Sequence, residues 1–108
     1  MMVLVTQHLR DRLKQRTNIK NVDSFISEVL SKRDEIEKLD IYSSNLSKHP
    51  QVMRKIHRNP IQRVWVIDWV GYYLLEENNS LITVFPIKKF DKIIYGGDKI
   101  INPLHHHN

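Results

Sequence analysis

The chain contains no cysteine, and it has only three glycines and four prolines among its 108 residues. The absence of cysteine excludes disulfide bonds and thiolate metal sites. The sequence has no glycine-rich phosphate-binding loop, no paired-carboxylate signature and no nucleophile elbow. It also has no internal repeat and no low-complexity block. These absences remove several common enzyme classes from consideration.

Long hydrophobic runs are also missing. No apolar stretch approaches the roughly 18 residues that a membrane-spanning helix needs. The apolar start at residues 1–5 is too short for a signal-peptide core and has no basic leader. We therefore expect a cytoplasmic protein without membrane contact, and the lack of cysteine suits a reducing compartment.

The remaining composition is that of a folded domain. Hydrophobic residues make up 41% of the chain and charged residues 27%, which is enough apolar material for one core. The length allows one domain. We expect a single α+β domain over residues 1–95, followed by a C-terminal tail over residues 96–108 that starts at two glycines.

The formal net charge is +5. A basic surface attracts polyanions, and nucleic acid is the commonest polyanion in a cytoplasm. The alternative is an ordinary basic protein that binds no nucleic acid. The distribution of the charges along the chain bears on this choice.

Two helices are expected in the N-terminal half. Thr6 can cap a helix over residues 7–16, in which Leu9 and Leu13 form the buried face. A second helix, capped by Asn21 or Asp23, is expected from its three-and-four spacing of apolar residues. That spacing continues to residue 39 through Val22, Phe25, Ile26, Val29, Leu30, Ile36 and Leu39.

Residues 40–60 have no clear periodicity. A short helix starting near Ser47 and a loop leading into a strand over residues 52–57 fit this segment equally well. His49 precedes a proline, and we expect it to be solvated. Asn59-Pro60 is a turn signal, because the residue before proline avoids the helical region.

β-branched and aromatic residues dominate after Pro60. Strands are expected over residues 63–69, 72–76 and 81–85, with a hairpin loop at residues 78–80 and a fourth strand at residues 93–95. The fold class predicted is therefore α+β, with two N-terminal helices on one face of an antiparallel sheet of three to four strands. The expected core residues are Leu9, Leu13, Phe25, Ile26, Val29, Leu30, Val64, Val66, Ile82 and Val84.

His8, Arg12 and Arg16 are spaced four residues apart on the first helix, beside its buried face. At about 100° per residue they form one slowly drifting stripe. A histidine flanked by two guanidiniums is suited to a phosphate group, because arginine forks match phosphate oxygens. The alternative is a solvated basic face, since this helix carries other cations as well.

The segment over residues 3–16, with its pattern H-x-x-x-R-x-x-x-R, resembles the start of a family of short bacterial and phage proteins of unknown function. That family is itself similar to the RelE-like and colicin-nuclease-like ribonuclease folds. The run over residues 81–85 resembles the family's closing strand, which has a threonine in its middle. The resemblance therefore implies a site formed by His8, Arg12, Arg16 and Thr83.

The activity that this resemblance implies is cleavage of RNA by a small toxin-type ribonuclease that needs no metal and no other cofactor. The RNA 2′-hydroxyl attacks the adjacent phosphate, with His8 as acid or base and the two arginines as a phosphate clamp. RNA is then the partner, together with an antitoxin or a host protein. The alternative function is a non-catalytic inhibitor that docks on a host protein or nucleic acid.

Another basic cluster lies in the segment without periodicity. Arg54, Lys55, His57 and Arg58 are the densest group of cations, and we interpret them as nucleic-acid-binding residues that contact the backbone. A solvated face is the alternative. We exclude the histidines at 105–107 from the site. Trp65 and Trp69 share one face of the expected strand, where they form either a base-stacking platform or core; the apolar sequence around them favours core.

Overall fold

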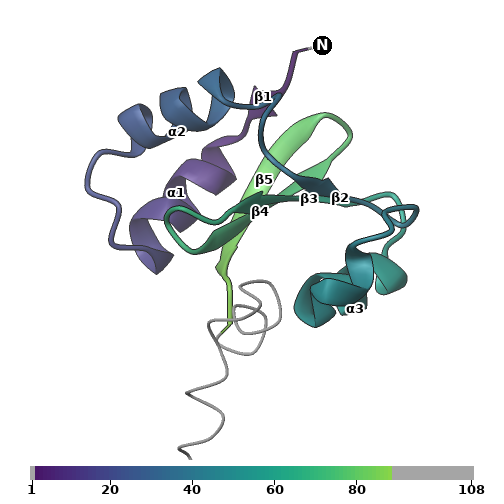
Figure 1. Ribbon diagram of the computed structural model, residues 1–108. Coiled ribbons are helices and arrows are strands. Elements are labelled where there is room, and N and C mark those ends of the chain that lie inside the picture. The colour runs from purple at the N-terminus through teal and green to yellow at the C-terminus, as the bar shows by residue number, and fades with distance from the viewer. Residues whose placement is uncertain (1, 89–108) are drawn as a thin grey trace, which may run out of the picture.

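A five-stranded mixed sheet forms the central layer of the computed structural model, which describes residues 2–88 (Figure 1). Three α-helices and one short 3₁₀ helix surround it, so the fold is α+β. In chain order the elements are β1 Leu4–Val5, α1 Gln7–Arg16, α2 Val22–Ser31, β2 Lys38–Leu39, η1 Leu46–Lys48, α3 Pro50–Arg58, β3 Arg63–Ile67, β4 Tyr72–Glu77 and β5 Ser80–Pro86.

The strand order is β1-β5-β4-β3-β2. The antiparallel meander β3–β4–β5 confirms the three strands predicted after Pro60. The prediction of a purely antiparallel sheet of three to four strands was wrong in detail. β1 pairs in parallel with β5, and β2 pairs antiparallel with β3. Both added strands have only two residues, too few to show the alternation by which strands are recognised.

The turn between β4 and β5 confirms the predicted hairpin. Asn78 and Asn79 have φ angles of 52° and 62°, in the left-handed region. Two consecutive residues with positive φ match the right-handed twist of the flanking strands, and asparagine tolerates this conformation better than most residues.

α1 begins where it was expected. The Thr6 hydroxyl accepts a hydrogen bond from the Leu9 amide at 3.1 Å and donates one to the Leu81 carbonyl at 3.0 Å. The cap therefore also fastens the start of α1 to β5. Leu9 and Leu13 are fully buried against the sheet.

α2 is shorter than predicted. Asn21 caps its start by accepting from the Ser24 amide at 2.9 Å, but the helix ends at Ser31 rather than at residue 39. The chain then turns, and Lys38–Leu39 pairs with β3. Ile36 is nevertheless buried, because the turn carries it back onto the same core. The spacing of Ile36 from the apolar residues of α2 therefore matches that of a longer helix, although the helix has ended.

The segment that lacked periodicity forms α3. Pro50 occupies its first turn, where a missing N–H costs nothing. α3 covers the face of the sheet opposite α1 and α2 (Figure 1), which corrects the prediction that the helices cover one face. His49, expected in solvent, is 1% exposed, with its Nδ1 2.9 Å from the Tyr73 hydroxyl.

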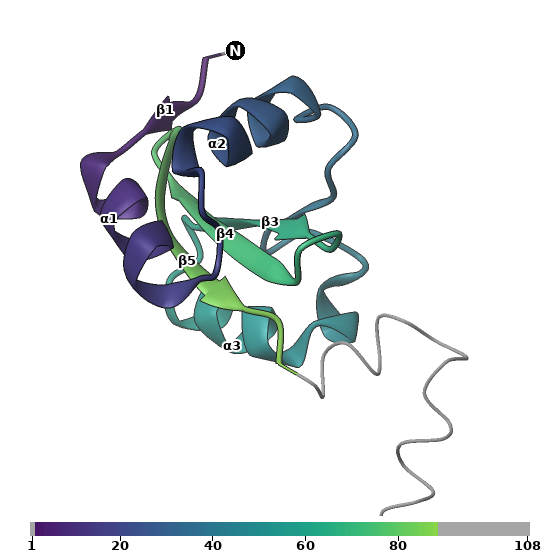
Figure 2. The same ribbon diagram turned by 90° about the vertical axis from the view of Figure 1, so that its left-hand side faces the viewer.

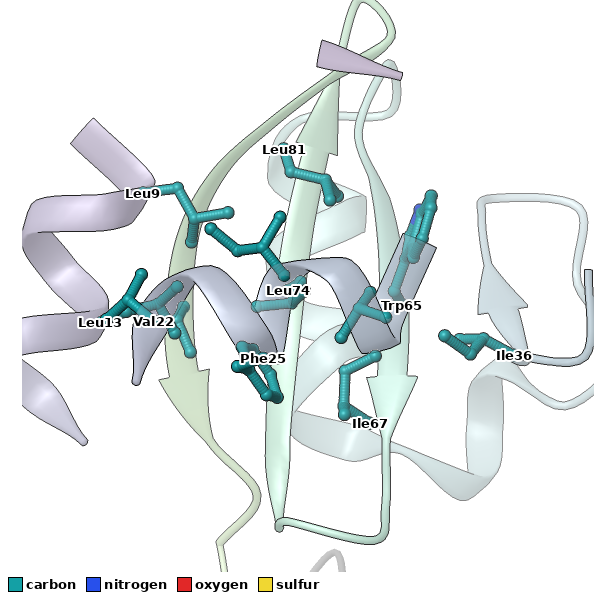
Figure 3. Packing of buried hydrophobic residues seen from close by; sticks show 12 residues of the cluster. Leu9, Leu13, Val22, Phe25, Ile36, Trp65, Ile67, Leu74 and Leu81 are labelled. Atoms are coloured by element: carbon teal, nitrogen blue, oxygen red, sulfur yellow. The ribbon is translucent and has the colours of Figure 1, made fainter. Parts of the chain in front are cut away.

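Because helices cover both faces, the sheet has a hydrophobic cluster on each side. Figure 3 shows the cluster under α1 and α2, where Leu9 and Leu13 meet side chains of α2 and the strands. Val64 through Ile67 are all buried, since alternate residues enter different clusters. Of the predicted core, eight residues are buried, while Leu30 and Ile82 are partly buried. Trp69 is 40% exposed, because β3 ends before it.

No helix within residues 2–88 is both long and apolar enough to cross a membrane. The strand expected at residues 93–95, the tail over residues 96–108 and the histidines at 105–107 lie outside the described residues.

Candidate nucleic-acid interface

The predicted stripe on α1 faces the outer edge of β5. Arg12 Nε donates to His8 Nε2 at 3.2 Å, and one Arg16 guanidinium nitrogen donates to the Val84 carbonyl at 3.4 Å. A guanidinium can only donate, so His8 Nε2 is the acceptor in this contact. The three side chains therefore line one flank of α1, with Arg16 used partly to cover the sheet edge.

Thr83 does not join these three side chains. It pairs across the sheet with Leu75, which belongs to the cluster under α3. Cross-strand partners point to the same face, so the Thr83 side chain lies on the α3 face of β5 whereas α1 packs on the other. The structure brings His8, Arg12 and Arg16 together on one helix flank and leaves Thr83 on the far face of the strand.

The edge of β5 is open beyond its first two residues. β1 pairs only with Ser80 and Leu81, so no strand of the described residues covers positions 82–86 on that side. This edge runs between α1 and α3 (Figure 2). Backbone groups along an open edge are available to a ligand or to side chains such as Arg16.

The basic residues of α3 form a second and better defined feature. Arg54, Lys55 and Arg58 line a hollow of about 340 Å³ between α3 and the end of β5. Lys88, Gln51, Phe85 and Pro86 complete its wall. We call this hollow the α3 groove. Its lining within residues 2–88 has four cations and no carboxylate.

No carboxylate of residues 2–88 neutralises the cations of the α3 groove, since none of the four forms an ion pair with one. Arg54, Arg58 and Lys88 are exposed. Lys55 lies with its ammonium 4.6 Å from the centre of the Phe85 ring, which fixes its position without removing its charge.

Gln51 holds the groove together. Its side chain is buried, its Nε2 donates to the Pro86 carbonyl at 3.0 Å, and its Oε1 accepts from the Lys88 amide at 3.1 Å. The Gln51 side-chain amide thus binds an acceptor at the end of β5 and a donor just after that strand. This places Lys88 opposite Arg54 and Arg58 across the hollow.

His57, predicted with this cluster, does not line the α3 groove. It is exposed on α3, two positions from Lys55, which at about 100° per residue places the two side chains on nearly opposite sides of the helix. Three of the four predicted residues are therefore brought together. The groove residues that sequence reasoning missed are Gln51, Phe85 and Lys88, because nothing local in the sequence links the end of β5 to α3.

A larger hollow of about 530 Å³ lies between α1 and the start of α2, and it is also basic, with Arg10, Lys14 and Lys20. Its wall includes Asp23, which forms an ion pair with Arg10. This pairing partly neutralises the hollow and makes it a weaker anion site than the α3 groove. Within residues 2–88, no three His, Asp or Glu side chains converge as metal ligands.

Comparison with protein-family models, curated proteins and solved structures finds no significant match for this chain. The geometry of the site therefore carries the functional argument.

Proposed function

We propose that this protein binds RNA and holds the phosphate backbone of a single strand in the α3 groove. The observation that carries the proposal is the set of four cations around one hollow with no carboxylate in its wall. Clustered cations without internal partners lower the free energy of a bound polyanion and release its counterions.

The open edge of β5 extends this surface toward α1. α1, which carries His8, Arg12 and Arg16, lies on one side of this edge and α3 on the other (Figure 2). The α3 groove lies between α3 and the end of β5. A strand of RNA that follows the edge can contact both sets of cations. The choice of RNA over DNA follows from the sequence resemblance to RNA-cleaving domains.

Binding should be strongly salt-dependent, and the dependence tests the groove. For single strands the slope of log affinity against log salt is about −0.7 per phosphate contact. Replacing Arg54 and Arg58 together by alanine should therefore reduce the slope by about 1.4 and weaken binding at low salt. Fluorescence anisotropy with a short labelled RNA over a salt series measures this.

The matched control is Lys14→Ala with Lys20→Ala, which removes the same charge from the other hollow. We expect this pair to change the slope much less. Equal slopes for the two double variants would mean that only net charge matters, and the α3 groove would lose its role.

Cleavage of the bound RNA is a second candidate function, favoured by the contact between Arg12 and His8. For this, Arg12 would turn from His8 to the phosphate, and the freed His8 Nε2 would take the proton of the 2′-hydroxyl as that oxygen attacks phosphorus. The bond from phosphorus to the 5′-oxygen breaks, the 5′-oxygen takes a proton from water, and a 2′,3′-cyclic phosphate remains. Arg12 would stabilise the charge that develops on the phosphoryl oxygens. This is the metal-independent reaction that the toxin-type resemblance implies.

His8→Ala should abolish cleavage of total RNA while leaving RNA affinity nearly unchanged, because the α3 groove is intact. The readout is the appearance of fragments with 2′,3′-cyclic phosphate ends. If the unaltered protein binds RNA without cleaving it, the protein is a non-catalytic binder and the alternative function of a docking inhibitor gains support.

A further inference from the structure

A third polar hollow, of about 160 Å³, lies at the opposite end of the sheet from the α3 groove. Glu76 of β4, Arg63 and Trp65 of β3, and Lys38 of β2 line it, with Arg33 and Asp34 of the loop after α2. It opens on the face covered by α1 and α2, since Trp65 belongs to that cluster. We call it the Glu76 hollow.

Glu76 is a buried carboxylate with one oxygen in use. Its side chain is 7% exposed, and Oε1 accepts a hydrogen bond from Trp65 Nε1 at 2.6 Å. Among residues 2–88, no hydrogen bond reaches Oε2. Within residues 2–88 no fully buried side-chain oxygen lacks a partner, so Oε2 is accessible, and Glu76 lines the hollow. An accessible carboxylate oxygen in a mostly buried side chain can accept a hydrogen bond from a ligand in the hollow.

Arg63 supplies the complementary group. Its Nε lies 3.9 Å from Glu76 Oε1, too far for a direct hydrogen bond but close enough for both to contact one small molecule. The Arg63 side chain is 46% exposed. Oε1 is the carboxylate oxygen nearer to Arg63. A planar ligand that lies along Glu76 and Arg63 would therefore meet the acceptors of the carboxylate first and the donors of the guanidinium next.

We propose that the Glu76 hollow binds a guanine base. The Watson–Crick edge of guanine carries two donors, the 2-amino group and N1–H, followed by the O6 acceptor, which is the complement of this order. Arginine is also the usual partner of guanine O6. Adenine offers an acceptor at N1 where guanine has a donor, and uracil has only one donor between two acceptors.

The rest of the wall is preformed. Lys38 Nζ donates to the carbonyls of Arg33 and Ile36 and lies 4.6 Å from the centre of the Trp65 ring. Burial lowers the pKa of Lys38 from its ordinary value, and the neighbouring charges of Asp34 and Glu76 counteract this. The wall formed by Trp65 and Glu76 is buried, and hydrogen bonds to charged groups are stronger where water is partly excluded.

Two sources can supply the base: a free guanine nucleotide, or a guanosine within an RNA strand. The inference holds for either source and does not depend on the proposed RNA groove, which lies at the other end and on the other face of the sheet. Only the RNA source would join the two sites in one ligand.

The test titrates the full chain with GMP, AMP and UMP while following the Trp65 indole N–H by NMR. We expect GMP to shift this signal and to bind at least about ten-fold more tightly than AMP or UMP, the discrimination typical of a good bidentate contact. Short RNAs with and without a single guanosine identify the source. If the protein prefers the guanosine-containing RNA, a guanosine within an RNA strand is also a ligand of the hollow. If it shows no preference between the RNAs, the ligand is the free nucleotide.

Two variants test the assigned atoms. Glu76→Gln keeps an acceptor for Trp65 but turns an amide toward the base, and Arg63→Met removes the O6 donor at a half-exposed position. Both should abolish the preference for GMP over AMP, whereas the control Lys20→Ala should retain it. If Glu76→Gln fails to fold, Arg63→Met decides. Equal affinity for GMP and AMP, retention of the preference in Arg63→Met, or no shift of Trp65 at millimolar GMP would overturn the proposal.

Discussion

At the scale of single residues, three side chains decide how the surface is arranged. Thr6 fastens α1 to β5, His49 packs at the start of α3, and Gln51 ties α3 to the chain after β5. Only the role of Thr6 as a cap followed from its position before a periodic segment. His49 was expected in solvent and no role was predicted for Gln51, because their burial depends on Tyr73 and Pro86, which are distant in sequence.

Replacement of Gln51 by leucine tests the tie directly. The change removes two hydrogen bonds at once and should lower the free energy of unfolding by about 1–3 kcal/mol, because the Pro86 carbonyl and the Lys88 amide lose their partner. Urea denaturation measures the loss. Gln7→Leu is the control, since Gln7 makes only an exposed contact with Asp11 and should change stability by less than about 0.5 kcal/mol. Equal effects of the two variants would contradict the role given to Gln51.

At the scale of elements, the helices and strands that were predicted correctly are those with a long, periodic sequence pattern. α1, the first part of α2 and the meander β3–β5 were predicted, because each repeats its pattern over several turns or alternations. The parallel pairing of β1 with β5 was not predicted, because it depends on where α1 and α2 return the chain. α3 was undecided because its basic flank lies against the end of β5 and only Val52 and Ile56 form a fully buried apolar face.

The placement of site residues on these elements explains which of them could be predicted from the sequence. His8, Arg12 and Arg16 share a flank because helical spacing alone brings them together. Arg54, Lys55 and Arg58 were identified as a cluster, but their groove required the end of β5. Thr83 was placed with α1 by resemblance, and a register shift between β4 and β5 near Leu75 sets the face to which it points. Strand facing is sensitive to a single bulged residue.

At the scale of the whole molecule, a sheet covered on both faces separates two polar sites. The α3 groove lies at one end of β5 on the α3 side, and the Glu76 hollow lies at the other end on the α2 side. The net charge of +5 indicated a polyanion ligand but not its location. The proposed location rests on which cations form ion pairs within residues 2–88, such as Arg10 with Asp23, and which do not.

The most direct test of the central claim is a map of amide chemical-shift changes on titration with a short single-stranded RNA of about 8–12 nucleotides, the length that small binding surfaces accommodate. The account predicts that the largest changes fall on α3 and the end of β5, around Arg54, Arg58 and Lys88, and extend along the open edge of β5 toward Arg16. These changes should decrease as salt is added. Changes centred on Lys14 and Lys20, or no changes at low salt, would contradict it.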